Sequence, residues 1–439
     1  MKVTDFSPPT LPSLDQQRDA LQKGLGRAMQ WAMAGKLDEG VLLDACLHDM
    51  RYDHQCEESR GTWLWQIIQV LHSETRFRSA ILEVMQNLTD VYQTEQLCQL
   101  AFHYASFGDE AFRSQLYQIV EVRPFDDLPW LVDWPILQLD GEEGFLFAAR
   151  IRGRQLEKRE WEWDDSALMN EAFERFGESR VNELLGATTD GMLNRYRDIW
   201  LQKKSGSKEG TSPRQAHADK MTQIPVADIT AAAESPESKH PYLRGWGRWA
   251  NDNDLETVLE RLLSAQEPRI IANYLKVFSG REFPRIVPEL VSLSQHTDPE
   301  VRRRAISALE NSSHPLVREL VEQELTRGVP HGLALGLFVK NYQDGDEQRI
   351  LDLTELPDDE AQVHWFLMDA TKILKQNPKA DCSQLGLLAY ALNPCGMCRG
   401  SAAELLRDRG LAPPWLMEEC RFDSESDNRK LIEQDSHAE

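Results

Sequence analysis

The sequence has little positive charge for its length and few cysteine residues. Its 439 residues include 49 Lys and Arg against 72 Asp and Glu, which gives a formal net charge of −23. Because nucleic-acid phosphates and anionic lipid surfaces both attract cationic proteins, this balance predicts no nucleic-acid partner and no membrane partner, and it favours a basic protein instead. The seven cysteines are too few for a disulfide scaffold and their number is odd, so we expect a reducing, cytoplasmic compartment.

Long apolar runs and strand patterns are also scarce. No stretch has the roughly 18 consecutive apolar residues of a membrane span, and no apolar segment typical of a signal peptide follows the N-terminal Lys2. Asp140-Gly141, between ILQL and EEGFLF, is the one place where a short hairpin is expected. Elsewhere apolar residues recur at steps of three and four, which predicts an all-α protein of many short helices.

Sequence signatures of catalysis are missing as well. There is no glycine-rich phosphate loop, no paired H-E-x-x-H spacing and no G-x-S-x-G nucleophile elbow. We therefore expect a protein that is not an enzyme and that has no catalytic or cofactor-binding residues.

Residues 203–240 break the helical pattern, because they are rich in Ser, Gly, Lys, Ala and Pro and contain no large aromatic residue. This composition predicts a flexible linker between an N-terminal helical domain, 1–202, and a C-terminal domain, 241–439. The net charges of the three segments are −14, +1 and −10 in chain order, so both predicted domains are acidic.

The C-terminal domain contains an internal repeat. Pro268, Pro299 and Pro330 are spaced by 31 residues, as are Pro284 and Pro315, and each unit is predicted to be a helix, a turn and a second helix. Asp298 is placed to cap the first helix of one unit, with proline at the first helical position. The residues expected on its buried face are Val301, Ala305, Ile306 and Leu309. Because a helical hairpin cannot bury both faces alone, such units are expected to stack.

The stretch from Asp298 to Ala305, DPEVRRRA, followed by Ala308-Leu309, resembles the HEAT repeat in the short form of phycobilisome-lyase-like proteins. The resemblance is clearest over 268–327 and is weaker on either side. It implies an α-solenoid of stacked antiparallel helix pairs, a shape whose members mostly act as binding scaffolds. Some relatives of this shape are enzymes, including bilin lyases and DNA alkylation glycosylases, but the repeat transfers no catalytic residue to this chain.

Four late cysteines form a candidate metal site with the spacing C-x12-C-x2-C-x21-C. Zinc takes four tetrahedral ligands, and a C-x-x-C at a helix start supplies two of them on one face. The alternatives are a redox pair, with Cys395 near a helix N-terminus, or thiols that are simply buried between helices. The candidate ligands are Cys382, Cys395, Cys398 and Cys420.

Two tryptophans surrounded by acids form the best candidate for partner binding. Exposed aromatic rings beside carboxylates suit the capture of a Lys- or Arg-rich peptide by charge and cation–π contact, although tryptophans more often pack in a core. The residues are Glu160, Trp161, Glu162, Trp163, Asp164 and Asp165.

The densest polar cluster extends from Asp44 to Glu58 and includes His48 and His54. Histidines flanked by acids can bind a metal or act as a base, but the cluster is interpreted as a solvated loop between helices. Part of it has an echo near the C-terminus: Arg51-Tyr52-Asp53 with Arg60 downstream matches Arg421-Phe422-Asp423 with Arg429 downstream. The echo predicts a shared turn in which Asp caps a helix and Arg bridges to it, or else it is chance similarity.

The favoured function is therefore a non-catalytic interaction scaffold or inhibitor, of an adaptor or immunity type, that presents an acidic solenoid surface to a basic partner. The alternatives are a HEAT-like enzyme of the lyase or DNA glycosylase type and a zinc-stabilised regulator. A basic concave groove would favour the glycosylase, whereas a bilin lyase would need a chromophore pocket.

Overall fold

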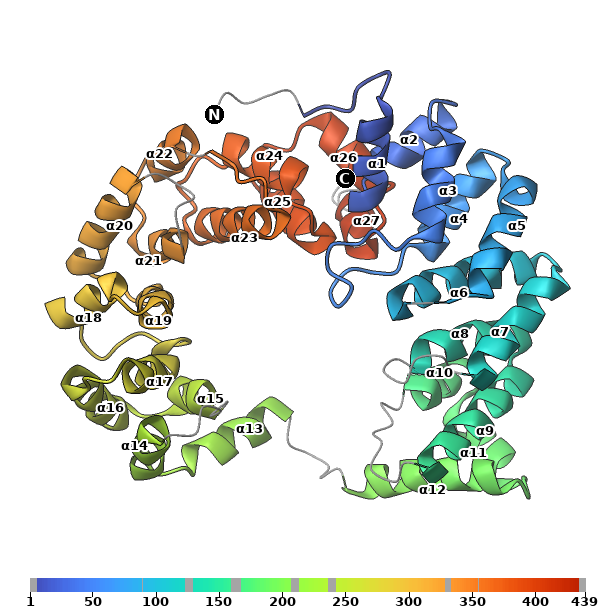
Figure 1. Ribbon diagram of the computed structural model, residues 1–439, viewed down its shortest axis with the longest axis horizontal. Coiled ribbons are helices and arrows are strands. Elements are labelled where there is room, and N and C mark those ends of the chain that lie inside the picture. The colour runs from blue at the N-terminus through green and yellow to red at the C-terminus, as the bar shows by residue number, and fades with distance from the viewer. Residues whose placement is uncertain are drawn as a thin grey trace. The chain divides into compact units, whose positions relative to one another are not determined.

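The computed structural model describes residues 6–88, 90–122, 129–158, 167–206, 213–235, 242–327, 333–353 and 355–433. Within these ranges the chain forms 27 α-helices and two 3-10 helices and contains no strand, which confirms the all-α prediction (Figure 1). The expected hairpin at Asp140-Gly141 is instead a helical turn, in which Gly141 takes φ 57° between two helices. No helix in the described part of the chain is both long and apolar enough to cross a membrane.

The chain divides into two compact units. Unit 1 comprises Met1–Phe6, Gly210–Pro394 and Cys398–Pro413, and unit 2 comprises Ser7–Glu209, Cys395–Met397 and Pro414–Glu439. The division differs from the predicted one in two respects. The predicted linker 203–240 contains two helices with buried Met221, Ile229 and Ala233, because its alanine-rich stretches form helices that bury small apolar faces. Residues 414–433, together with Cys395–Met397, belong with the N-terminal half rather than with the rest of the predicted C-terminal domain.

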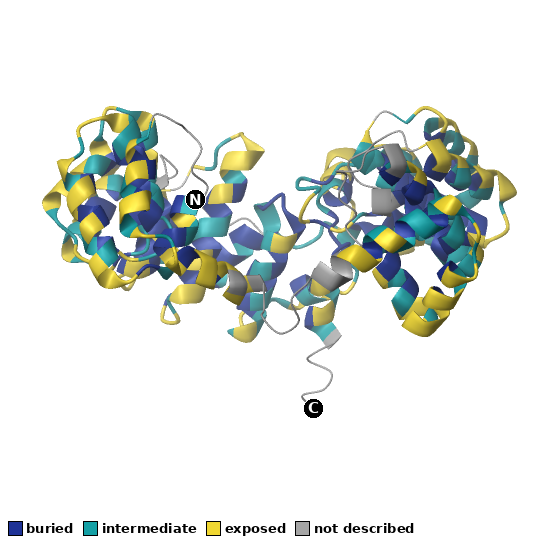
Figure 2. Ribbon diagram, turned by 90° about the horizontal axis from the view of Figure 1, so that it is seen from below, coloured by how far each residue is buried: buried dark blue, intermediate teal, exposed yellow. Residues whose placement is uncertain are grey.

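Unit 2 is built from twelve consecutive helices in the described ranges, to which two C-terminal helices are added. Their bounds are α1 Leu14–Lys23, α2 Arg27–Met33, α3 Glu39–Leu47, α4 Gly61–Val70, α5 Glu74–Met85, α6 Val91–Ser106, α7 Glu110–Val122, α8 Pro129–Asp140, α9 Glu142–Lys158, α10 Ala167–Phe176, α11 Glu178–Gly186, α12 Gly191–Gly206, α26 Pro414–Cys420 and α27 Ser426–Glu433. Helix α4 packs on α6, and α6 packs on α8, while α5 packs on α7. Buried apolar residues of α1 to α12 form one continuous core, against which Phe422 packs; Figure 2 shows the buried residues in dark blue.

The two ends of the chain meet inside unit 2. In Figure 1, α26 and α27 lie beside α1 and α2. The Arg27 guanidinium binds the buried Glu419 carboxylate at 2.6 Å, and the Trp63 indole N–H donates to the Phe422 carbonyl at 2.8 Å. The Ser424 amide donates to the Gly24 carbonyl at 2.9 Å. Contacts between residues that are far apart in the sequence therefore hold α26 and α27 against the N-terminal helices.

Unit 1 contains the remaining helices of the described ranges. Their bounds are α13 Pro213–Thr222, α14 Val226–Glu234, α15 Tyr242–Trp249, α16 Asp252–Ser264, α17 Pro268–Phe278, α18 Pro288–Ser292, η1 Leu293–Gln295, α19 Pro299–Leu309, α20 Pro315–Arg327, η2 Leu333–Leu337, α21 Phe338–Asn341, α22 Asp346–Leu353, α23 Glu360–Gln376, α24 Ser383–Leu392 and α25 Gly396–Asp408, which begins in unit 2. Odd-numbered helices pack on one another in the order α13, α15, α17 and α19, which we call layer A. The intervening helices α14, α16, α18 and α20 form layer B.

The repeat predicted from the sequence begins its first helices where expected. Helices α17 and α19 start at Pro268 and Pro299, and the Asp298 carboxylate accepts hydrogen bonds from the amides of the second and third helical residues. The four residues predicted for the buried face of α19 are all buried. The second helix of the first unit begins at Pro288 rather than at Pro284. Arg303 and Arg304 bind Glu300 of their own helix, and Arg303 is exposed.

Candidate functional site

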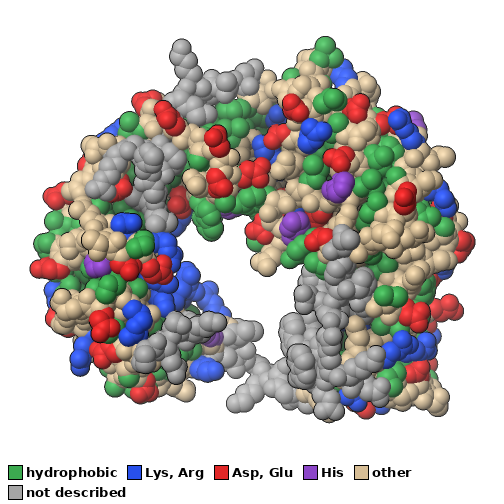
Figure 3. Space-filling view, in the orientation of Figure 1, with side chains coloured by type: hydrophobic (Ala, Val, Ile, Leu, Met, Phe, Trp, Pro, Cys, Tyr) green, Lys and Arg blue, Asp and Glu red, His purple; other side chains and the backbone are tan. Residues whose placement is uncertain are grey.

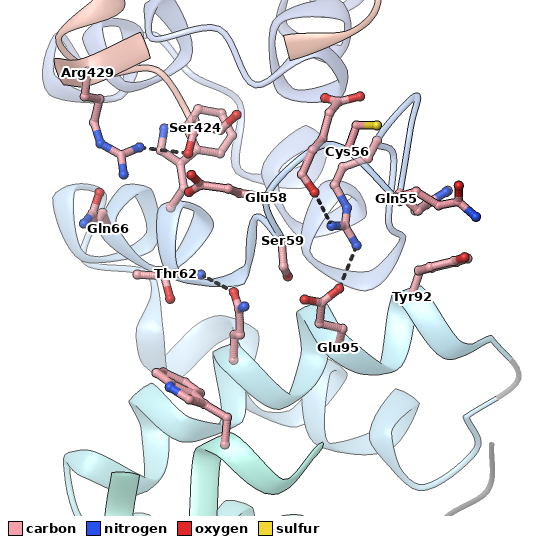
Figure 4. A pocket seen from close by; sticks show the side chains of 16 residues that line it. Gln55, Cys56, Glu58, Ser59, Thr62, Gln66, Tyr92, Glu95, Ser424 and Arg429 are labelled. Atoms are coloured by element: carbon pink, nitrogen blue, oxygen red, sulfur yellow. Dashed lines mark hydrogen bonds and ion pairs between the residues drawn. The ribbon is translucent and has the colours of Figure 1, made fainter. Parts of the chain in front are cut away.

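Unit 2 contains a pocket of about 800 Å³ where the loop between α3 and α4 faces α6 and the start of α27 (Figure 4). Six of the sixteen lining residues come from the loop that the sequence marks as the densest polar cluster. The lining residues are Arg51, His54, Gln55, Cys56, Glu57, Glu58, Ser59, Thr62, Trp63, Gln66, Tyr92, Glu95, Gln99, Trp134, Ser424 and Arg429.

A buried arginine organises one side of the pocket. The Arg51 side chain is 1% exposed, and its guanidinium binds the Asp49 carboxylate at 2.6 Å and the Glu95 carboxylate at 3.0 Å. It also donates to the Glu57 carbonyl at 2.9 Å. Burial alone would raise the pKa of Asp49, but hydrogen bonds and charge from Arg51 lower it overall. Burial raises the pKa of Glu95, and Arg51 offsets this rise only in part.

A second buried arginine, Arg60, also holds the loop between α3 and α4 in place. Arg60 is 2% exposed and binds the Glu57 carboxylate at 2.7 Å, while another of its N–H groups donates to the Leu21 carbonyl at the end of α1. The other oxygen of Glu57 accepts from the Asp53 amide at 2.9 Å. Asp53 in turn accepts from the amides of Gln55 and Cys56. The loop is thus held in one conformation by its own charged groups.

A carboxyl in an unfavourable environment, Glu425, follows the lining residue Ser424 in the sequence. One oxygen of Glu425 accepts from the Glu58 amide at 3.2 Å, and the other, Oε1, is buried without a hydrogen-bond partner. Glu58 reciprocates by accepting from the Ser426 amide at 3.2 Å. Burial, together with the charges of Asp423, Glu57 and Glu58, raises the pKa of Glu425 to about 7.

The raised pKa of Glu425 makes the stability of unit 2 fall as the pH rises. Between the ordinary pKa near 4.5 and the folded pKa near 7, the folded state binds more protons than the unfolded chain, so stability is lost through this window. We expect Glu425→Gln to remove this loss and to gain about 2–3 kcal/mol over wild type at pH 8, but little at pH 4. Unfolding in urea at a series of pH values measures the difference.

The matched control for this pH series is Glu418→Gln, which changes an exposed carboxyl on α26. It should leave the pH profile of wild type unchanged. A Glu425→Gln profile that runs parallel to wild type between pH 4 and pH 8 would contradict the assignment of the raised pKa to this carboxyl.

Aromatic rings form another part of the lining. The His54 ring stacks on Tyr92 with centroids 4.3 Å apart, and both side chains are partly exposed. The rings of Trp63 and Trp134 also line the pocket. In Figure 4, Tyr92 and Gln55 lie on one side of the pocket and Arg429, Ser424 and Gln66 on the other, with Glu58 and Ser59 between them. Aromatic faces beside carboxylates suit a cationic ligand.

The charges of the lining favour a cation. Glu57, Glu58 and Glu95 contribute carboxylates, whereas only Arg51 and Arg429 contribute cations. Both arginines already donate to protein oxygens, Arg429 to the carbonyls of Asp423 and Ser424 at 2.6 and 2.8 Å. Glu57 binds Arg60 and Glu95 binds Arg51, so the exposed Glu58 carboxylate is the negative charge that a ligand meets in this pocket.

The Cys56 thiol, which lines the pocket, is a poorly activated nucleophile. Cys56 lies exposed on the lining, and its hydrogen bond to Asp53 raises the pKa of its thiol. A neutral thiol is a weak nucleophile at neutral pH. His103, whose ring bonds the Thr62 hydroxyl at 3.1 Å, has a pKa lowered by burial to about 4 and is neutral at physiological pH. These two groups suit binding better than acid–base or covalent chemistry.

The echo seen in the sequence lies at this pocket. Both of its segments contribute to the lining, and Asp423 repeats the role of Asp53 by accepting from the amide two residues on, at 2.9 Å. Arg429 reaches Asp423 through the backbone carbonyl of that residue, whereas Arg60 binds the Glu57 carboxylate. This echo is the sequence signal that points to the pocket. The polar cluster from Asp44 to Glu58, by contrast, is interpreted from the sequence as a solvated loop.

The residues predicted to bind a partner, Trp161 and Trp163 with Glu160, Glu162, Asp164 and Asp165, lie outside the described residues. None of the four predicted zinc ligands forms a disulfide. Cys382, Cys395 and Cys420 are buried and Cys398 is half-buried. Cys420 and Cys395 belong to unit 2, while Cys382 and Cys398 belong to unit 1. Within unit 1, the Cys398 sulfur lies within 4.8 Å of a ring nitrogen of His364. The zinc site stays a prediction.

No family model, curated protein or solved structure matches this chain.

Proposed function

We propose that this chain is a non-catalytic interaction protein, a scaffold or inhibitor, whose unit 2 pocket receives a Lys or Arg side chain of a basic protein partner. The observation that carries the proposal is the charge of the pocket: the exposed Glu58 carboxylate forms no ion pair among the described residues, and the two lining arginines already bind oxygen atoms of the protein. A long cationic side chain can lay its stem against the partly exposed Tyr92 ring while its head meets the Glu58 carboxylate.

We also propose that the helices stack as an α-solenoid of HEAT-like pairs. Two features support this arrangement. The proline-initiated helices α17 and α19 are 31 residues apart and pack on each other, and unit 1 separates its helices into layers A and B. A stack of this kind presents rows of side chains on each layer, and such rows suit extended partners.

A basic hexapeptide of alternating Arg and Lys, labelled with fluorescein, tests the function by fluorescence anisotropy with the full-length protein. Glu58 is exposed on the pocket, so Glu58→Lys is expected to weaken binding at least tenfold at 50 mM salt. The matched control is Glu110→Lys, which makes the same charge change on α7 of the same unit and is expected to stay within twofold of wild type. Equal losses in the two variants would show that only the overall charge attracts the peptide, and would overturn the proposal.

A further inference from the structure

The two layers of unit 1 carry opposite charge. The four helices of layer A contain nine Lys and Arg and two acidic residues, whereas the four helices of layer B contain three Lys and Arg and ten acidic residues. Helices α15 and α17, which are neighbours in layer A, contain no Asp or Glu. The net charge of the whole chain therefore hides a strongly basic layer.

The basic side chains of layer A form a continuous row. Arg244 and Arg248 are exposed one turn apart on α15, and the Arg248 guanidinium lies close to Gly280, just beyond the end of α17. Lys276 follows on α17. Burial lowers the pKa of Lys276, and the nearby positive charge of Arg304 on α19 lowers it further. Figure 3 shows Lys and Arg side chains gathered over this part of unit 1.

The acids of layer A do not neutralise this row. Glu300 is shared between Arg303 and Arg304, so these three side chains together keep a net charge of +1. Asp219 of α13 accepts from Gln215 one turn away. Neither Arg244 nor Arg248 has an acidic partner among the described residues.

Aromatic rings accompany the cations. Tyr242 and Trp249 are partly exposed at the two ends of α15, and the Arg214 guanidinium of α13 lies 5.9 Å from the centroid of the Trp249 ring. The His217 ring lies near Gly245 of the same helix. Cations that follow a backbone, interleaved with partly exposed rings on which bases stack, are typical of surfaces for single-stranded nucleic acid.

We propose that layer A of unit 1, centred on Arg244, Arg248 and Lys276, is a binding surface for single-stranded nucleic acid. The row runs across three neighbouring helices, each about 8–10 Å from the next, which is a length of several nucleotides. This surface is independent of the pocket in unit 2, and it departs from the expectation, drawn from the net charge, that nucleic acid is not a partner.

The test is binding of a fluorescein-labelled 15-nucleotide oligo-dT to the full-length protein, followed by anisotropy from 20 to 200 mM salt. Each phosphate contact contributes about 0.7 to the slope of log K against log salt for single strands. Arg244→Ala/Arg248→Ala is expected to lower that slope by about 1.4 and to weaken binding about 25-fold at 0.1 M salt.

The matched control is Arg261→Ala/Arg285→Ala, which removes the same charge from exposed arginines paired with acids of layer B. It should bind oligo-dT as wild type does. Three results would overturn the proposal: no binding at 20 mM salt, equal losses in the two double variants, or competition by poly-Glu of equal length as strong as by unlabelled oligo-dT. The last result would assign the surface to an acidic protein.

Discussion

Replacing Gly26 with alanine is expected to lower the free energy of unfolding of unit 2 by about 3 kcal/mol. A Cβ at this position would lie 1.9 Å from the Glu419 carbonyl oxygen and within about 3 Å of backbone atoms of Phe422 and Asp423. These are backbone atoms, so no side-chain rotation can relieve the clash, and overpacking of this kind costs about 1–3 kcal/mol or more. Unfolding in urea, with hydrogen exchange of peptides from α4 as the readout, measures the loss in the free energy of unfolding.

The same variant should loosen the contact between the two ends of the chain. Amides of α26 and α27 are expected to exchange faster in Gly26→Ala than in wild type, because α26 must move away from α2. Gly186→Ala is the control, since nothing lies within 4 Å of a Cβ there and alanine favours a helix by up to about 1 kcal/mol. Equal stability in Gly26→Ala and wild type would contradict the packing of α26 described for unit 2.

Arg51→Ala is expected to destabilise unit 2 by about 3–5 kcal/mol at pH 7. The substitution leaves the carboxylates of Asp49 and Glu95 buried without their cation, and an uncompensated buried charge has a cost of that order. Arg18→Ala is the matched control: it removes an exposed arginine paired with an exposed aspartate and should change stability by less than about 1 kcal/mol.

The loss in Arg51→Ala should depend on pH in a defined direction. In wild type the pKa of Asp49 is lowered, so its contribution is present above the ordinary pKa of an aspartate and is lost as the pH falls through the folded value. Without Arg51 both carboxyls are expected to take up protons more readily, and the difference from wild type should shrink as the pH falls from 7 towards 4. A difference that stays constant over this range would show that packing, rather than charge, accounts for the loss.

Local rules predicted the elements of the repeat well. Asp298 caps α19, proline begins α17 and α19, and the buried face of α19 consists of the residues that the three- and four-residue spacing indicated. These features depend on neighbours within a few residues, so they can be read from the sequence. The position of α18 could not be, because Pro284 and Pro288 both satisfy the rule for a helix start.

The pocket and the basic layer depend on contacts that a linear sequence does not display. Ser424 and Arg429 reach the loop at Arg51 only because α26 and α27 pack on the N-terminal helices. The glycines at positions 24 and 26, which lacked any phosphate-loop pattern, are the small residues that allow this approach. The composition does not reveal the positive charge of layer A, because the acids of layer B cancel it in a sum over the whole chain.

An environment-sensitive fluorophore on Cys56 tests the proposed function most directly. Cys56 is the exposed member of the seven cysteines and lines the pocket, so labelling at about pH 8.5, where more of its thiol is ionised, places a probe at the proposed site. Titration with the basic hexapeptide should change the fluorescence, saturate at one peptide per chain, and fail in Glu58→Lys. Peptide binding by anisotropy with unchanged fluorescence at Cys56 would contradict the assignment of the pocket as the binding site.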